Sequence, residues 1–309
     1  MQVQRRTESG SFLSRSIYPL AAIALLASMA VAQSRHSSRG SELEGTVLNV
    51  VATRTDSKQD PINITDLYLY ENAVEQKIKN FTFDPSPSRI IILVDNSQTL
   101  PIAVDTLKQA VMEFAYEIFD GDQLFVLAYD TKAEIIQEWT DDAKKLEASL
   151  ATFRKKDNPY LFDALGDTVR EVVMPLKPGS SKTAVVVIGD GLDRGSKTSF
   201  DKILSTLQTD DITVYALQVP DRTGGAYRRD QPKASQVISR LTEETGGKAF
   251  PFEEAQEAAK FICDELRKNR YLLSYLPVNT STYDARRVFL TAGQGITVRT
   301  KTAQPPNIQ

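Results

Sequence analysis

Residues 89–99 read RIIILVDNSQT, and residues 183–193 read TAVVVIGDGLD. Each stretch contains an unbroken run of mostly branched apolar side chains, which is typical of a strand buried on both faces of a parallel sheet. Each run then gives way at once to acidic, hydroxyl-bearing or small residues, which mark the end of a strand. The two stretches therefore predict central strands of an α/β sheet with polar loops at their carboxyl ends.

The residues around these strands alternate between strand and helix patterns. Further strand patterns lie at 124–129, 133–139, 212–219 and 248–252, and helical spacing recurs at 103–118, 142–153, 161–174, 200–207, 234–244 and 253–269. Segment 133–139 is placed to form a hairpin with 124–129. Alternation of this kind predicts a doubly wound, mostly parallel sheet with helices on both faces. We assign this α/β domain to residues 88–270.

A second, smaller region is β-like at both ends of the globular part. Strand patterns occur at 46–53, 67–70 and 76–81, and again at 271–276, 287–290 and 296–300. Segment 43–84 is too small to fold alone. We therefore expect it to form a small β extension together with the strands of residues 271–300.

The amino terminus has the composition of a secretory signal peptide. Arg5, Arg6 and Arg15 precede an apolar run over residues 17–32, which ends in Ala30-Val31-Ala32. This order of charged, apolar and small residues predicts a signal peptide over residues 1–32, cleaved after Ala32, followed by a polar linker over 33–42. The expected location is secreted or periplasmic, with no membrane span after cleavage; the alternative is an uncleaved signal anchor.

Composition excludes several classes of function. The chain of 309 residues has one histidine, one cysteine and a formal net charge of −3. A dedicated nucleic-acid-binding protein would carry a basic excess, so no nucleic-acid partner is expected. His36 falls in the linker and Cys263 on an apolar helix face, so catalytic triads, zinc clusters and disulfides are excluded from the domain. Any site must be built from oxygen ligands.

Oxygen-bearing side chains follow the two central strands. Asp95, Ser97 and Thr99 alternate after the first strand, and Asp190 follows the other. Ligands in open α/β sheets bind at the carboxyl ends of the strands. Carboxylate and hydroxyl oxygens there suit Mg²⁺, Mn²⁺ or Ca²⁺. The alternative is that the two aspartates only cap helices.

The same residues resemble a von Willebrand factor type A domain. The segments that carry the resemblance are DNSQT at 95–99, NPYLFDAL at 158–165, VVVIGDGLD at 185–193, TGGK at 245–248 and RYLLSYLP at 270–277. The preceding β segment is similar to that of a bacterial subgroup of secreted, type A-related proteins. The resemblance covers roughly residues 43–290.

The resemblance implies a metal-ion-dependent adhesion site, abbreviated MIDAS. Asp95, Ser97 and Thr99 match the first loop of that motif, and Asp190 matches the acid of its third loop. The second loop departs from the family pattern, because Pro159 stands where a threonine ligand is expected. Either Asp157 or Asn158 would have to compensate. The resemblance thus implies an Mg²⁺ site, or one for Mn²⁺ or Ca²⁺, that is weakened or lost because of Pro159.

The function that follows from the resemblance is protein binding without turnover. We expect a non-enzymatic adhesion module in which the carboxylate of a partner protein completes the metal's coordination. The first alternative is a metal-independent envelope scaffold or assembly factor with a degenerate MIDAS. The second is a metal-dependent hydrolase, for which the sequence offers no base beyond single carboxylates. The oligomeric state is not predicted.

Overall fold

The computed structural model describes residues 45–56, 60–177, 182–221, 231–279 and 283–306. The signal peptide expected at 1–32 and the linker expected at 33–42 lie outside these residues. No helix within the described ranges combines the length and the apolar character needed to cross a bilayer.

Strands and helices occur where the sequence patterns predicted them, with a few additions. The strands are β1 (Thr46–Arg54), β2 (Leu67–Glu71), β3 (Val74–Gln76), β4 (Ile78–Phe83), β5 (Arg89–Asp95), β6 (Gln123–Tyr129), β7 (Ala133–Thr140), β8 (Thr183–Gly189), β9 (Thr213–Gln218), β10 (Ala249–Pro251), β11 (Arg270–Tyr275), β12 (Arg286–Ala292), β13 (Ile296–Arg299) and β14 (Ala303–Gln304). The helices are α1 (Val104–Glu117), α2 (Ala143–Leu150), α3 (Leu161–Thr168), α4 (Phe200–Thr209), α5 (Ala234–Glu243) and α6 (Ala255–Lys268). The helix expected at 161–174 is α3 followed by a π-helical turn, Val169–Val173, and a short 3-10 turn.

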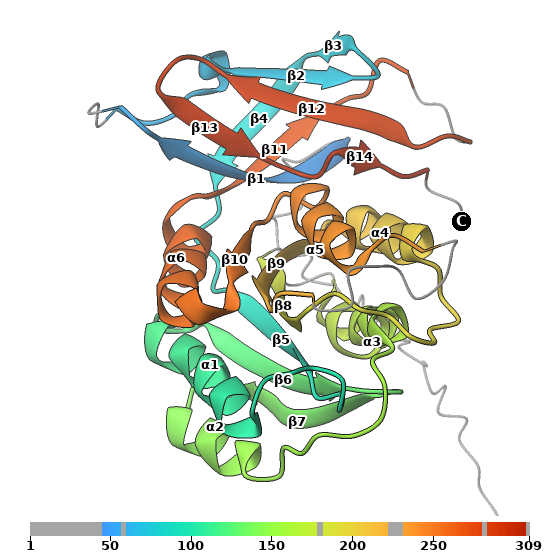
Figure 1. Ribbon diagram of the computed structural model, residues 1–309. Helices are drawn as coiled ribbons and strands as arrows, with labels where there is room; N and C mark the ends of the chain where they lie inside the picture. The colour runs from blue at the N-terminus through green and yellow to red at the C-terminus, as the bar shows by residue number, and fades with distance from the viewer. Residues whose placement is uncertain (1–44, 57–59, 178–181, 222–230, 280–282, 307–309) are drawn as a thin grey trace, which may run out of the picture. The chain divides into compact units, whose positions relative to one another are not determined.

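The larger sheet has six strands in the order β10-β9-β8-β5-β6-β7 (Figure 1). All neighbours are parallel except β6 and β7, which form the expected antiparallel hairpin. The apolar runs of β5 and β8 lie at the centre of the sheet, and their residues are buried. The doubly wound, mostly parallel α/β fold predicted from the sequence is therefore confirmed.

Alternate side chains of the central strands belong to two different cores. Ile90, Ile92 and Val94 of β5 pack with α1, α2 and α6 on one face of the sheet. Ile91 and Leu93 pack with α3, α4 and α5 on the other face. Both faces are covered because β5 is apolar at every position from Ile90 to Val94, and this property distinguishes it from the alternating strands of the second region.

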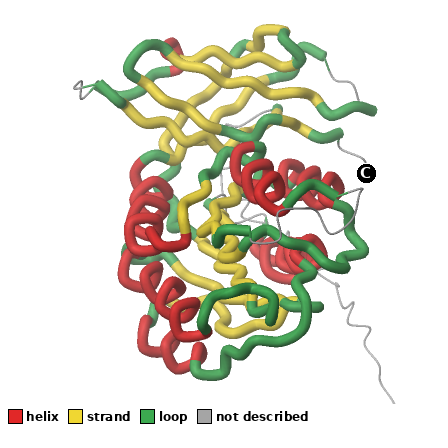
Figure 2. Tube along the Cα trace, viewed as in Figure 1, coloured by secondary structure: helices red, strands yellow, loops and turns green. Residues whose placement is uncertain are grey.

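The second region is a β-sandwich of two four-stranded sheets, β13-β1-β11-β4 and β14-β12-β2-β3. Figure 2 shows that it is almost entirely strand and loop, with one short helical turn, Ile64–Asp66. Strands from both ends of the described chain pair here: β1 with β11 and β13, and β2 with β12. Their inward side chains form a third core, to which Leu48, Leu69, Leu273 and Val288 belong.

One strand expectation for the sandwich is wrong in detail. The alternating residues 76–81 were expected to form a single strand, but the chain turns at Lys77 between β3 and β4. These two strands belong to different sheets. The alternation of apolar and polar residues continues through Lys77, so the sequence pattern does not show that the chain passes from one sheet to the other there.

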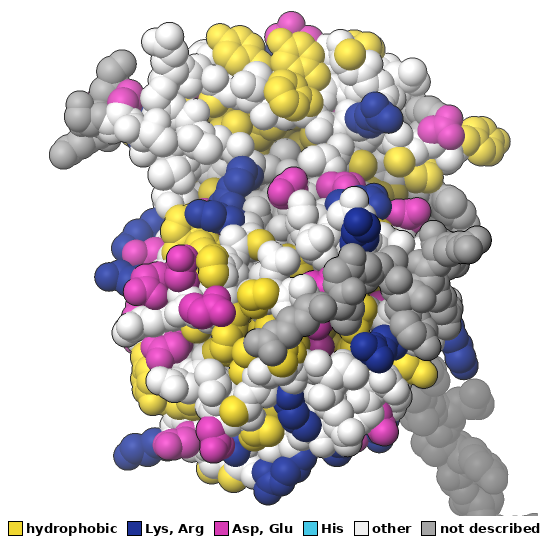
Figure 3. All heavy atoms as spheres, in the orientation of Figure 1, with side chains coloured by type: hydrophobic (Ala, Val, Ile, Leu, Met, Phe, Trp, Pro, Cys, Tyr) yellow, Lys and Arg dark blue, Asp and Glu magenta, His cyan; other side chains and the backbone are white. Residues whose placement is uncertain are grey.

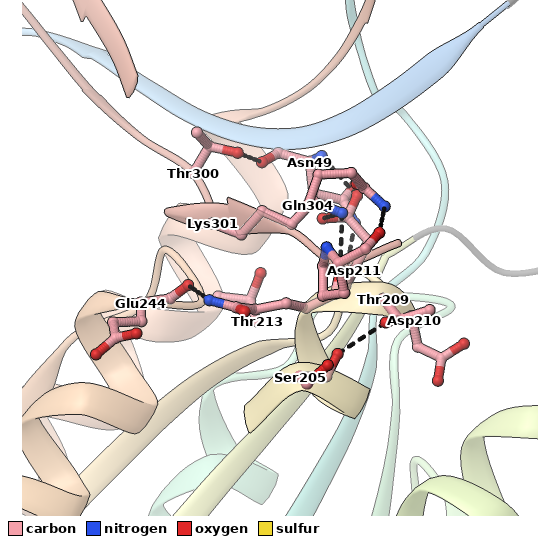
Figure 4. Close-up of polar contacts among 12 residues, drawn as sticks. Asn49, Ser205, Thr209, Asp210, Asp211, Thr213, Glu244, Thr300, Lys301 and Gln304 are labelled. Carbon is pink, nitrogen blue, oxygen red and sulfur yellow. Dashed lines mark hydrogen bonds and ion pairs between the residues drawn. The ribbon is translucent and has the colours of Figure 1, made fainter. Parts of the chain in front are cut away.

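A polar junction links the sandwich to the turn between α4 and β9 (Figure 4). Asp211 accepts a hydrogen bond from the Asn49 backbone N–H at 2.7 Å, and its carbonyl accepts one from the Asn49 side-chain amide at 2.9 Å. Lys301 is buried; its ammonium donates to the Gln208 carbonyl at 2.8 Å and lies 3.4 Å from the Asp211 carboxylate. All these residues belong to one unit, Ser41–Gln309.

The visible surface carries both signs of charge. Lys and Arg side chains are interspersed with Asp and Glu side chains over this face, and hydrophobic side chains lie over β2 and β12 (Figure 3). Tyr68 of β2 and Phe289 of β12 are exposed there.

Candidate metal-binding site

The carboxyl ends of β5, β6, β8 and β9 share one edge of the sheet because these strands are parallel. Three segments meet at this edge. We call residues 96–103, after β5, the first loop; residues 151–160, between α2 and α3, the second loop; and residues 190–199, after β8, the third loop. This carboxyl edge is the position at which ligands bind in open α/β sheets.

Asp95, the last residue of β5, is fully buried although it is acidic. Its Oδ1 accepts a hydrogen bond from the backbone N–H of Ser97 at 2.7 Å, which fixes the carboxylate against the first loop. Its Oδ2 is also buried and has no hydrogen-bond partner among the described residues. Because a buried carboxylate oxygen without a partner is costly, this atom needs a donor or a cation. The side-chain donor at this place is the Tyr129 hydroxyl, which is itself buried and whose pKa is raised by burial and by the charge of Asp95.

The two hydroxyl groups of the first loop lie together. Ser97 is buried, and its Oγ lies 3.0 Å from Oγ1 of Thr99. Thr99 is partly exposed, so the hydroxyl pair lies between the buried carboxylate of Asp95 and solvent. The alternation of Asp95, Ser97 and Thr99 in sequence thus places three oxygen-bearing side chains in one turn.

Asp190 opens the third loop on the neighbouring strand, β8. It is buried, and its Oδ1 accepts a hydrogen bond from the Leu192 backbone N–H at 2.9 Å. The preceding Gly189 lies directly against Asp95: a Cβ on Gly189 would lie 3.1 Å from the Cβ of Asp95. The close approach that glycine permits here brings the two aspartates to adjacent positions of the edge.

The two carboxyl groups have shifted pKa values. Burial raises the pKa of Asp95 to about 7, and the nearby charge of Asp190 adds to that shift. Hydrogen bonds from Ser97 and the charge of Lys155 act in the opposite direction. Burial also raises the pKa of Asp190. Desolvated acids that repel each other are stabilised by a bound cation.

The second loop meets the first through its backbone. The Lys156 N–H donates to the Asn96 carbonyl at 2.8 Å, and the Gln98 N–H donates to the carbonyls of Lys156 and Asp157, each at 3.1 Å. Pro159 is buried and has no side-chain oxygen; its carbonyl accepts from the Arg194 N–H of the third loop at 2.8 Å. Asp157 and Asn158 are exposed, and the contact of Asp157 with the first loop is through its carbonyl.

The donor set fits a hard divalent cation. Within the described part of the chain, no three His, Cys, Asp or Glu side chains gather into a metal cluster. A cation at this edge would therefore be held by the carboxylates of Asp95 and Asp190 together with the hydroxyls of Ser97 and Thr99. Oxygen ligands of this type suit Mg²⁺, Mn²⁺ or Ca²⁺. The buried, unpartnered Oδ2 of Asp95 is the atom that such an ion would satisfy.

Comparison with known families by sequence finds no match. No family model matches the chain. No curated protein matches it either.

Solved structures are similar to it at low identity. An aerotolerance-related membrane protein from Bacteroides fragilis is 16% identical, with a TM-score of 0.47, over 59% of this chain and 99% of its own. A von Willebrand factor type A protein from Catenulispora acidiphila is 10% identical, with a TM-score of 0.47, over 86% and 71%. Proximal thread matrix protein 1 from the mussel byssus, with a zinc-occupied MIDAS motif, is 14% identical, with a TM-score of 0.45, over 63% and 49%.

The solved structures that are similar thus include von Willebrand factor type A proteins, the family that the sequence resembles. The fold is established by the strand order of this chain, and the site by its own geometry.

Two residues of this edge were not predicted from the sequence. Tyr129 ends β6 opposite Asp95 in register, and its buried hydroxyl would lie 3.0 Å from a Cβ on Gly189. Lys155 of the second loop acts on Asp95 through its charge. Tyr129 was missed because it closes an apolar run, and Lys155 because it lies within a polar segment without periodicity.

The third loop is held in place by two acidic side chains, Asp163 and Asp193. Asp163 of α3 accepts hydrogen bonds from the backbone N–H groups of Lys197 and Thr198, each at 2.9 Å. Asp193 accepts one from the Phe162 N–H at 3.2 Å. These contacts fix the loop that carries Asp190.

Proposed function

We propose that this protein is a non-enzymatic interaction module that binds a partner protein through a divalent cation. In this proposal, Asp95, Ser97, Thr99 and Asp190 hold Mg²⁺, or alternatively Mn²⁺ or Ca²⁺, at the carboxyl edge of the sheet. Such a ligand set leaves coordination positions open, because hard cations take six or more oxygen ligands. An acidic residue of the partner would fill one of these positions.

The observation that carries the proposal is the environment of Asp95. This carboxylate is fully buried, one oxygen has no partner among the described residues, and the Ser97–Thr99 hydroxyl pair lies beside it. A purely structural aspartate that caps a loop would use both oxygens or expose one. A bound cation accounts for the burial, the unpartnered oxygen and the nearby second acid together.

Titration calorimetry with Mg²⁺, Mn²⁺ and Ca²⁺ tests the metal site. The wild-type chain is expected to bind one ion, and Asp95→Asn and Ser97→Ala are each expected to weaken binding at least tenfold. Asp264→Asn is the matched control, because Asp264 lies on α6 and pairs with Lys268 at 2.7 Å. Unchanged binding by Asp95→Asn, with its folding verified by circular dichroism, would show that the ion binds elsewhere.

Affinity capture from the native cell envelope tests the partner. Wild-type protein is expected to retain a partner in Mg²⁺ and release it in chelator, whereas Asp95→Asn is expected to retain none in either. Capture that is equal in all four conditions would contradict a metal-dependent mechanism.

Pro159 favours a second candidate function. Because proline supplies no oxygen at the position of the family's threonine, the site has fewer ligands than a complete MIDAS. A metal-independent envelope scaffold or assembly factor on the same fold is therefore the alternative. It predicts no calorimetric binding of any of the three ions and capture that is insensitive to chelator.

The proposal of binding without turnover is supported by the residues available for chemistry. The thiol of Cys263 is buried in the core, and burial raises its pKa far above the usual range, so it is not a nucleophile. A secreted or periplasmic location is proposed from the signal-peptide composition of residues 1–32. Mass spectrometry of the protein recovered from the envelope would reveal whether cleavage occurs after Ala32.

A further inference from the structure

The second loop places a lysine against the first loop. Asn96 donates from its side-chain amide to the Arg154 carbonyl at 2.8 Å, and the Lys156 N–H donates to the Asn96 carbonyl, also at 2.8 Å. Lys155 is therefore held between two residues that are both bound to Asn96. Its ammonium donates a hydrogen bond to the carbonyl of Leu100, the residue that follows Thr99.

The neighbouring Lys156 has a different environment. Its ammonium pairs with Glu134 of β7 at 2.6 Å, which is a surface ion pair. The two consecutive lysines thus serve different partners: Lys156 binds an acid of the β6–β7 hairpin, whereas Lys155 lies on the loop that carries Ser97 and Thr99. Lys156 can therefore serve as the control for substitutions of Lys155, because it is also a lysine and is adjacent in the sequence.

The charge of Lys155 reaches the buried acid of the site. It lowers the pKa of Asp95, and Asp95 in turn raises the pKa of Lys155 against the effect of burial. Lys156 differs from Lys155 in this respect, because its pKa is raised mainly by its hydrogen bond with Glu134. Lys155 thus combines a contact with the first loop and a charge that acts on Asp95.

We propose that Lys155 is a resident cation of the carboxyl edge, which partly neutralises Asp95 when no metal is bound and opposes the binding of a divalent ion. The proposal rests on the proposed metal site and adds a residue that sets its affinity. A fixed positive charge near a divalent ion repels it, and the charge of Lys155 lowers the cost of burying the Asp95 carboxylate in the metal-free protein. The missing oxygen at Pro159 and the added charge of Lys155 therefore both reduce affinity for the ion.

Two substitutions separate charge from hydrogen bonding. Lys155→Gln keeps a side-chain donor for the Leu100 carbonyl but removes the charge, and Lys155→Arg keeps the charge. Lys156→Gln is the control. We expect Lys155→Gln to bind Mg²⁺ about three- to tenfold more tightly than wild type at pH 8, as measured by calorimetry. Lys155→Arg and Lys156→Gln are expected to stay within about twofold of wild type.

A second measurement does not depend on metal binding. In chelator at pH 8, Lys155→Gln is expected to melt at a lower temperature than Lys156→Gln, because the buried carboxylate of Asp95 then lacks the nearby ammonium. Lys155→Arg is expected to melt close to wild type. If no variant binds Mg²⁺, Mn²⁺ or Ca²⁺, the proposed function fails, and this melting order alone decides whether Lys155 is the resident cation.

The outcomes distinguish the two proposals. Tighter Mg²⁺ binding by Lys155→Gln supports the role of Lys155, including the case in which only that variant binds the ion. Equal Mg²⁺ affinity of Lys155→Gln and wild type overturns it while leaving the metal site intact. Where no variant binds Mg²⁺, equal melting of Lys155→Gln and Lys156→Gln overturns it as well.

Discussion

Asp95 carries a proton more readily in the folded chain than in the unfolded one. Its pKa is raised from the usual 3.8 to about 7 by burial, with a contribution from Asp190. A group whose pKa is raised on folding contributes stability that is fully present below the unfolded pKa and is lost as the pH rises through the folded pKa. In chelator, the free energy of unfolding should therefore fall between about pH 4 and pH 7 on account of Asp95.

Urea denaturation in chelator at several pH values between 5 and 8 measures this effect. Asp95→Asn cannot titrate at this position, so its stability should depend less steeply on pH than that of wild type. Asp264→Asn should follow the wild-type profile. If wild type and Asp95→Asn gave parallel profiles, the raised pKa of Asp95 would be wrong.

Metal binding should have the opposite dependence on pH. A cation binds the ionised carboxylate, so Asp95 must lose its proton before it can serve as a ligand. The apparent affinity for Mg²⁺ is expected to rise between pH 6 and pH 8 and then level off. Calorimetry at pH 6, 7 and 8 would check this, and an affinity that stayed constant over that range would exclude Asp95 as the titrating ligand.

Gly189 lies where a side chain does not fit. A Cβ there would lie 3.0 Å from the Tyr129 hydroxyl and 3.1 Å from the Asp95 Cβ. Gly189→Ala is expected to lower the free energy of unfolding by roughly 1–3 kcal/mol, the usual cost of overpacking. Gly166→Ala is the control, since no atom lies within 4 Å of its added Cβ in α3, and it should stabilise the protein by about 0.5–1 kcal/mol. Equal effects of both changes in urea denaturation would contradict the close packing at Gly189.

At the level of residues, the sequence predicted which oxygen-bearing side chains follow the central strands but not their surroundings; their role as metal ligands stays a prediction. Asp95, Ser97, Thr99 and Asp190 were found because polar residues after an apolar run are visible in the sequence. The roles of Gly189, Tyr129 and Lys155 depend on which strands and loops become neighbours. That information arises from tertiary contacts, and spacing along the chain does not contain it.

The turn between α4 and β9 is an element whose stability depends on the sandwich. Asp211 has a positive φ of 55° and accepts hydrogen bonds from Asn49 while lying near the ammonium of Lys301. Asp211→Ala removes the carboxylate beside the buried ammonium of Lys301 and places alanine in the left-handed region. We expect a loss of roughly 2–4 kcal/mol in the free energy of unfolding.

Thermal or urea unfolding of two further variants checks this turn. Asp211→Asn tolerates the left-handed backbone and keeps an acceptor, so its loss should be smaller than that of Asp211→Ala. Asp210→Ala removes only an ion pair with Lys177 on the surface, which is worth about 0–1 kcal/mol. A loss for Asp210→Ala as large as that for Asp211→Ala would show that the junction is not the cause.

At the level of elements, buried strands were the easiest to predict. The apolar runs of β5 and β8 indicate strands that are buried on both faces, because a strand with one face in solvent would alternate between apolar and polar residues. The boundary between β3 and β4 was missed since alternation persists across the turn at Lys77. Strand β14 was missed because two residues are too few to show a period.

For the whole molecule, the C-terminal strands complete a sheet that begins near the other end of the described chain. Removing residues 286–309 would take away β12, β13 and β14, leaving β2 paired only with β3 and exposing the sandwich core. The truncated chain is expected to lose the sandwich and to aggregate or melt at a much lower temperature. Removal of residues 307–309 alone is the control and should leave the melting temperature unchanged. Equal melting of the two truncated chains would contradict this dependence.

The pairing of β1 with β13 also has a kinetic consequence. Val51 pairs with Arg299, so β1 and β13 are neighbours in one sheet although the whole α/β domain separates them in the sequence. Contacts between residues this far apart in the chain form slowly, because the intervening chain must be ordered or enclosed in a large loop first. During synthesis the α/β domain has all its strands before β12 and β13 emerge from the ribosome. We therefore expect refolding in two phases, with the six-stranded sheet forming first and closure of the sandwich limiting the overall rate.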